Sequence, residues 1–302
     1  MSGAAEQLLT MAKLAVRGMR PGGGERPSAS LAPRRRIALE ERVAPDPGRA
    51  ARYLRATDGE RIGALGGDEG TVSPCYCATW ETAVTLRLLS QLEGDFPLGG
   101  VLHLESELLP LRPLRADDHV RCRLELERSE TTPRGVRLTL TARNWNGAEQ
   151  LCSQSTAVYL IRSRDAAASP ASSRQAPDAG EGEGWEELHR WALRSGAGRR
   201  YALASGDYNP IHLWSWTARP FGFRRPILHG HCTRAMVAHV LIERRFRGDP
   251  TGLRRLGITF RAPLLLPARV CLQVRETEGR GEFRVVGEDG AKVYAEGSFA
   301  GA

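Results

Sequence analysis

The feature that most constrains the fold of this chain is a plan that occurs twice, once on either side of residues 163–184. That segment is small, polar and rich in Pro, Gly and Ser, which is typical of a linker. Each half is predicted to contain one long helix followed by an antiparallel meander. After the linker, an apolar helical pattern precedes four strand-like runs: Gly230–Glu243, then Leu256–Ala262, Arg269–Thr277, Glu282–Val286 and Lys292–Phe299. Before the linker, the same order occurs: Cys77–Leu92, then Val101–Leu109, His119–Glu127, Gly135–Arg143 and Glu149–Ile161.

Smaller features repeat at matching places. Leu109-Pro110-Leu111 closes the first strand after one helix, and Ala262-Pro263-Leu264 closes its counterpart. Upstream of the helices, YLRATDG at 53–59 aligns with YALASGD at 201–207. A sheet with one buried face needs a helix to cover it, and two such units can join edge to edge. We therefore predict an α+β chain in which a curled antiparallel sheet wraps a long helix, in duplicate.

The domain organisation follows from these repeats. We expect an N-terminal helix and a basic connector over residues 1–45, one domain over 46–162, the linker over 163–184 and a second domain over 185–302. Residues 1–20 are amphipathic with a single acid, Glu6, so they form either a helix that packs on the body or an organelle transit peptide.

Composition narrows the class of partner and the compartment. The formal net charge is +8, but the basic residues are spread along the chain and interleaved with acids, which argues against nucleic acid and leaves a small phosphorylated ligand or an acidic carrier protein. Six cysteines show no CxxC pair, which favours a reducing, cytoplasmic setting. The longest apolar stretch, about 235–242, is too short to cross a bilayer.

The segment SGDYNPIH, Ser205–His212, carries the chemistry. Gly206 suits the left-handed position that ends a short helix starting near Gly198, so Asp207 emerges just past that end. The residue before Pro210 is pushed toward extended geometry, and Pro210 can open the next helical turn. His212 would lie on that turn, directed back at Asp207.

An aspartate beside a histidine can manage a proton at neutral pH. The alternative is an Asp that caps a helix over a packed His, and the Gly and Asn-Pro around the pair favour the functional interpretation. Gly230 opens the long apolar helix of the second half, where unpaired amides and the helix dipole could polarise a thioester carbonyl. The alternative for Gly230 is a tight helix entry without a ligand.

YALASGDYNPIH, TARPFGF and PILHGHCT resemble the MaoC-like hydratases, the (R)-specific enoyl-thioester hydratases and dehydratases of the hot dog fold. The resemblance covers residues 185–302 and implies a double hot dog fold for the chain. It implies that Asp207 and His212 hold the water that adds across the double bond and handle the protons. It also implies that Asn209 orders the loop and that the Gly230 amide binds the thioester carbonyl. We place Ser205 and His229 with these as substrate-binding residues.

The resemblance further implies acyl groups carried on coenzyme A or acyl carrier protein, no cofactor, and a monomeric pseudodimer or a homodimer of it. The first half is similar to the degenerate copy of two-domain members, because it keeps Tyr53 and Asp58-Gly59 but has Pro74-Cys75 where the second half has His229-Gly230. Its helix could have moved aside to admit a long acyl tail. Trp214 and Trp216 depart from the pattern and could alter the substrate tunnel.

Alternatives from other classes stay open. A hot dog acyl-thioesterase would hydrolyse the ester in the same pocket, and a catalytically silent acyl-thioester-binding protein would do neither reaction. A zinc site of His212, His229, His231 and Cys232 is disfavoured, because residues two apart at a helix start diverge. The other histidines, His103, His119, His189 and His239, lack an acidic or Cys partner at useful spacing and are expected to be ordinary surface or core residues. Five arginines form either a solvated face or a clamp for coenzyme A phosphates or an acidic carrier helix: Arg199, Arg200, Arg219, Arg224 and Arg225.

Overall fold

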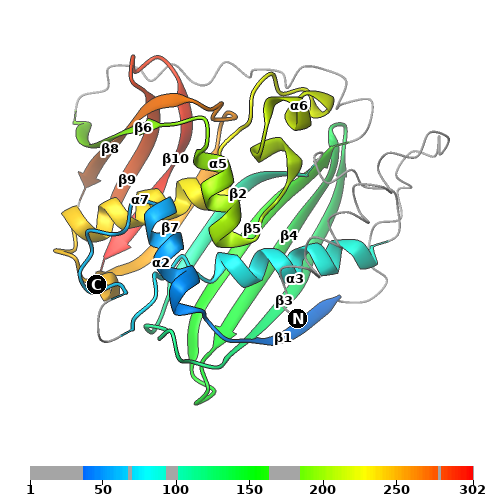
Figure 1. Ribbon diagram of the computed structural model, residues 1–302, viewed down its shortest axis with the longest axis vertical. Coiled ribbons are helices and arrows are strands. Elements are labelled where there is room, and N and C mark those ends of the chain that lie inside the picture. The colour runs from blue at the N-terminus through cyan, green and yellow to red at the C-terminus, as the bar shows by residue number, and fades with distance from the viewer. Residues whose placement is uncertain (1–36, 67–69, 93–100, 163–183, 278–279, 302) are drawn as a thin grey trace.

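The structure is a computed structural model that describes residues 37–66, 70–92, 101–162, 184–277 and 280–301 (Figure 1). The expected N-terminal helix over residues 1–20 lies outside the described residues, as does the linker up to residue 183. Residues 38–43, expected to belong to the basic connector, instead form a strand.

The described part of the chain contains the predicted long helices and meander strands of both halves, together with further helices and strands. In the first half the elements are β1 Ala38–Val43, α2 Pro47–Ala56, α3 Ala78–Gln91, β2 Val101–Pro110, β3 Val120–Thr132, β4 Gly135–Trp145 and β5 Leu151–Arg162. In the second half they are β6 Glu186–Leu193, α5 Ala197–Ser205, η2 Pro210–His212, α6 Ser215–Ala218, η3 Arg219–Phe221, α7 Gly230–Arg244, η4 Pro250–Gly252, β7 Leu253–Phe260, β8 Ala268–Thr277, β9 Arg280–Gly287 and β10 Val293–Gly301. The two long helices and the eight meander strands that the sequence predicts are confirmed to within a few residues.

The ten strands form one antiparallel sheet in the order β1-β3-β4-β5-β2-β7-β10-β9-β8-β6. The halves join where β2 pairs with β7, from Glu105 opposite Thr259 to Leu108 opposite Leu256. The predicted edge-to-edge join of two curled sheets is therefore confirmed. The outer strands β1 and β6 were not predicted from the sequence; each adds to its half through pairing with β3 or β8.

Each long helix lies against the sheet of its own half (Figure 1). Every residue of α7 from His231 to Ile242 is buried, so this helix has no solvent face over that stretch. Helix α3 buries Trp80, Val84 and Leu88, which pack against the first half of the sheet. The core thus forms between each helix and its strands, and the two helices start near the join of the halves.

Side chains also hold the two halves together next to the Ser205–His212 segment. The buried rings of Tyr53 and Tyr201, the two tyrosines that open the aligned segments, have centroids 5.7 Å apart. His239 of α7 contacts the first half through Ser73 Oγ at 2.7 Å and the carbonyl oxygen of Thr57 at 2.9 Å. The first half is therefore packed directly against the helices that carry the motif.

Among the residues that the structure describes, no helix is both long and apolar enough to cross a membrane. All six cysteines are buried and free.

Candidate active site

The motif loop forms as its residues predict. Helix α5 ends at Gly206, whose φ of 81° is left-handed and whose N–H bonds the carbonyl oxygen of Ala202. Asn209 has an extended ψ of 124° and caps the η2 turn by accepting from the N–H of Ile211. Pro210 opens that turn and His212 closes it. The predicted turn therefore does place Asp207 and His212 on one side of the loop.

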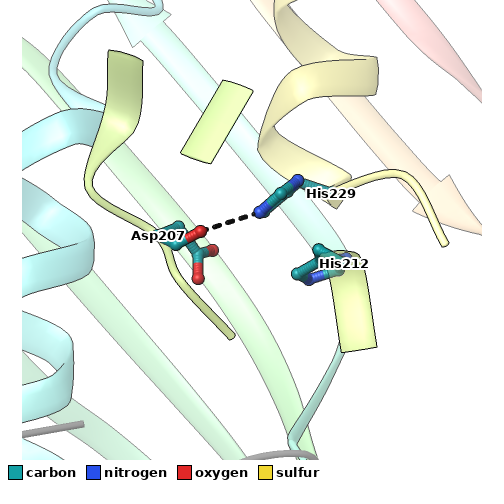
Figure 2. A group of neighbouring side chains, drawn as sticks. All are labelled: Asp207, His212 and His229. Atoms are coloured by element: carbon teal, nitrogen blue, oxygen red, sulfur yellow. Dashed lines mark hydrogen bonds between the residues drawn. The ribbon is translucent and has the colours of Figure 1, made fainter. Parts of the chain in front are cut away.

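Asp207, His212 and His229 meet at one point (Figure 2). One side-chain ligand atom from each lies within 4.8 Å of the others. The Nδ1–H of His212 donates to the carbonyl oxygen of Ile227 at 2.8 Å, which leaves the lone pair on Nε2. The Nε2–H of His229 donates to the backbone oxygen of Asp207 at 3.0 Å. His212 thus presents an acceptor, while His229 fixes the backbone of Asp207.

Burial sets the protonation of these groups. It lowers the pKa of His212 to about 3, with help from neighbouring His229, and lowers the pKa of His229 to about 3 as well. Burial also raises the pKa of Asp207 above its usual range, an effect that His212 opposes. At neutral pH, His212 is therefore a neutral imidazole. It faces the carboxyl group of Asp207, whose pKa is raised.

The three ligand types also raise the question of a metal. The rings of His212 and His229 are stacked, with centroids 3.7 Å apart and planes at 26°. Tetrahedral zinc ligation requires lone pairs that converge on one ion, whereas the lone pairs of stacked rings run side by side. His231 and Cys232, the other ligands considered, turn away toward Tyr159 and the carbonyl of Ala56. The arrangement does not fit zinc.

Asp207 and His212, called the dyad below, lie at the wall of a cavity of about 530 Å³ that both halves line. Its polar wall includes Asp207, Asn209, His212 and Gly230 from the second half. Its apolar wall comes largely from α3, β2, the end of β7 and the loop that follows it: Leu86, Leu89, Val101, Leu102, Leu104, Phe260 and Leu264. A cavity with one acid–base pair and a long apolar flank suits a ligand with a polar head and a hydrocarbon chain.

Gly230 lies at the first turn of α7, where amide N–H groups have no partner within the helix. A Cβ added there would lie 2.7 Å from Nδ1 of His103 and 3.0 Å from Cζ of Phe260. The glycine therefore lets strands β2 and β7 approach the start of the helix closely, and it leaves the amide beside the cavity.

Two of the predicted substrate-binding residues lie behind the cavity wall. Ser205 is fully buried, and its Oγ accepts from the N–H of Asp207 at 3.1 Å. His229 is 1% exposed and packs under His212. Neither lines the cavity. In this geometry both support the loop, whereas Asn209 and Gly230 face the cavity.

Several residues of the site were not predicted from the sequence, because their partners are remote. Tyr159 and His103 line the cavity from the first half. His103 was expected to be an ordinary surface or core histidine, but it forms part of the cavity wall. His189 was expected to have no acidic partner, but its Nε2 lies 3.1 Å from Asp58. These contacts depend on the packing of segments that are far apart in the sequence, and no local pattern marks them.

The tryptophans that were expected to alter the tunnel do not reach it. Trp214 and Trp216 stack on each other at 5.9 Å and are 43% and 70% exposed. Neither lines the cavity. Arg199 lies over the ring of Trp214 and donates to the carbonyl of Leu213. These residues therefore form an exposed surface beside the motif.

Comparison with known proteins places this geometry in a family. The sequence model of the MaoC-like domain matches residues 190–296, which span the motif loop, α7 and nearly all of the second-half sheet. The second half of this chain is a MaoC-like domain. The 3-hydroxyacyl-thioester dehydratase X of Mycobacterium tuberculosis is similar over 253 residues, at 28% identity, covering 84% of each chain.

Solved structures show the same fold over both halves. The crystal structure of HtdX of Mycobacterium tuberculosis superposes with a TM-score of 0.71 at 22% identity, over 89% of this chain and all of that one. A Mycobacterium tuberculosis protein described as having a double hot dog fold superposes with a TM-score of 0.56 at 14% identity, over 89% and 96% of the chains. The chain is thus a two-domain hot dog protein with a MaoC-like domain, and the relatives that it matches are hydratases and dehydratases, which are hydro-lyases.

Proposed function

We propose that this chain catalyses the reversible syn addition of water to a trans-2-enoyl thioester, giving the (3R)-hydroxyacyl thioester, with dehydration as the reverse reaction. The acyl group would be carried on coenzyme A or on acyl carrier protein. The relative named a 3-hydroxyacyl-thioester dehydratase supports this substrate class.

The observation that carries the proposal is the pair of acceptors at the cavity wall. The neutral His212 offers Nε2, and the carboxylate of Asp207 offers its oxygens, within the same 4.8 Å cluster. A water molecule has two O–H groups, so it can donate one to each acceptor while its lone pair faces Cβ of the substrate. Holding the nucleophile in this way supplies much of what an addition to an activated double bond needs.

The thioester carbonyl would lie against the amide of Gly230. As the water oxygen bonds to Cβ, the π electrons shift toward the thioester oxygen, and the start of α7 stabilises that charge. One water proton passes to Asp207 or His212, and the pair then delivers that proton to Cα on the same face. The side chains then return to their starting protonation, so the reaction needs no cofactor.

The acyl tail would lie along the apolar part of the cavity, next to α3. Leu86 and Leu89 of α3 and Val101 of β2 line that part. The first half would thereby bind the chain while the second half performs the chemistry. The two hot dog units already pair through β2 and β7 within one chain. We infer that the working unit is this monomeric pseudodimer or a homodimer of it.

The free cysteines support a reducing, cytoplasmic location.

A single spectrophotometric assay with crotonyl-CoA tests the proposal. A hydratase removes the enoyl absorbance without releasing thiol. A thioesterase releases free coenzyme A, and a silent binding protein changes neither signal while still binding the thioester. Loss of enoyl absorbance with formation of the (3R) product is the expected result, and either of the other two patterns would overturn it.

A further inference from the structure

A second polar group lies in the cavity wall, apart from Asp207 and His212. It consists of His103 of β2, Tyr159 of β5 and His231 of α7, all of which line the cavity. The ring of His103 stacks on Tyr159 with centroids 4.8 Å apart and lies 4.5 Å from the ring of His231. The Tyr159 hydroxyl and Nε2 of His231 are 3.1 Å apart. Two of the three residues come from the half that lacks the catalytic motif.

The hydrogen bond between Tyr159 and His231 has a preferred direction. Burial, together with His103 and Arg234, lowers the pKa of His231 well below its usual value, so the ring is neutral and carries a single N–H. Its Nδ1 is buried and has no partner among the described residues. A buried N–H without an acceptor is rarer and costlier than a buried lone pair without a donor. The proton therefore lies on Nε2, which donates to the Tyr159 oxygen.

This direction leaves the hydroxyl hydrogen of Tyr159 for another acceptor. The structure gives the hydroxyl no other partner within the described residues. Burial and the nearby charge of Asp207 raise the pKa of Tyr159, so the phenol keeps its proton in the working pH range. Tyr159 is thus a neutral donor with a free hydrogen at the wall of the cavity.

The place of this donor indicates its acceptor. His231 directly follows Gly230 in the chain, and Nδ1 of His103 is packed against the Gly230 backbone. The three rings therefore lie together beside the start of α7, where the carbonyl oxygen of an acyl thioester would gather negative charge. Resting on the function proposed above, we propose that the Tyr159 hydroxyl, oriented by His231, is a second donor to the thioester oxygen beside the Gly230 amide.

The first half then contributes to the chemistry as well as to binding. A second donor directed at the developing oxyanion stabilises the transition state more than the ground state, so its loss lowers kcat more than it raises KM. His231 acts through Tyr159 and is a positioning residue. His103 holds the Tyr159 ring by stacking.

The test is Tyr159→Phe in the full chain, which keeps the ring and removes only the hydroxyl. The matched control is Tyr76→Phe, because Tyr76 is a buried tyrosine that does not line the cavity. With crotonyl-CoA, we expect Tyr159→Phe to lower kcat about 100-fold with KM changed a few-fold at most, while the control stays within twofold of wild type. A thermal melt confirms that both variants fold.

A second readout follows the carbonyl itself. Butyryl-CoA labelled with carbon-13 at the carbonyl has no double bond, so it binds without reacting. Its infrared C=O stretch should shift to lower frequency on binding to wild type and to Tyr76→Phe, and shift less on Tyr159→Phe. For His231, we expect kcat to fall about tenfold in His231→Leu and to recover in His231→Gln, whose amide can donate to Tyr159.

Unchanged kcat and an unchanged carbonyl stretch in Tyr159→Phe would overturn the inference, as would a rise in KM alone. If the wild type does not hydrate crotonyl-CoA at all, the proposed function fails. The infrared comparison would still decide the role of Tyr159, because it requires only binding.

Discussion

Arg49 of α2 donates from Nη2 to the carbonyl oxygen of Ser205 at 2.5 Å, two residues before Asp207. Its Nε also donates to the carbonyl oxygen of Ala204 at 2.7 Å. Carbonyl groups at the end of a helix lack partners within it, and a cation is favoured at that end of the dipole. A residue of the first half therefore caps the helix that precedes the Asp207–His212 loop of the second half.

We predict that Arg49→Met destabilises the fold by about 2 kcal/mol, since two hydrogen bonds from a charged group are lost. The motif loop loses part of its support, so kcat should fall as well. Arg52→Met is the control, because Arg52 is an exposed residue on the same helix. Urea unfolding and the crotonyl-CoA assay measure both effects, and equal behaviour of the two variants would show that the cap is dispensable.

Asp207→Asn and His212→Gln should each lower kcat by about 100-fold or more without unfolding the chain. Each change replaces a proton-accepting atom with an amide while keeping the size of the side chain similar. Turnover numbers and circular dichroism measured side by side make the test. Wild-type activity in either variant would refute the assignment of the dyad.

Gly230→Ala should lower kcat about 10- to 100-fold, because the new methyl group meets His103 and Phe260 and displaces the start of α7. Gly63→Ala is the matched control, since a Cβ there meets nothing within 4 Å. Steady-state kinetics on both variants decide the point. An active Gly230→Ala would mean that the close approach at this position has no catalytic role.

Stability should fall as the pH drops below about 6.5, partly because of His239. Burial lowers the pKa of His239 to about 4, below its ordinary value of 6.5. Between these values the unfolded chain binds a proton that the folded chain does not, so stability is lost as pH falls, by about 1.4 kcal/mol per pH unit for one such group. His239→Gln should show a shallower dependence between pH 6.5 and 4 than the exposed-site control His119→Gln. Parallel slopes in urea titrations would contradict this.

A fragment of residues 185–302 should aggregate or pair with itself. It would lose the partner of β7 along Leu256–Thr259 and expose the buried Leu256 and Ile258. Size-exclusion chromatography shows its state. A soluble, monomeric fragment with full activity on long-chain substrates would mean that the first half serves another purpose.

The sequence by itself determined the features that depend on neighbours along the chain. The two long helices and the meander strands follow from periodicity, and the turn that holds Asp207 and His212 follows from Gly206 and Pro210, whose backbone preferences act within a few residues. The repeat then indicated two packed units, because each sheet needs a helix to cover it.

Only the tertiary structure decided which remote residues complete the site. Arg49 meets Ala204 across 155 positions, and Tyr159 meets His231 across 72. Those contacts depend on the register of β2 against β7 and on the packing of α2 beside α5, which no local pattern encodes. The short edge strands β1 and β6 escaped prediction for the same reason, since strand formation depends on the partner strand as much as on the residues themselves.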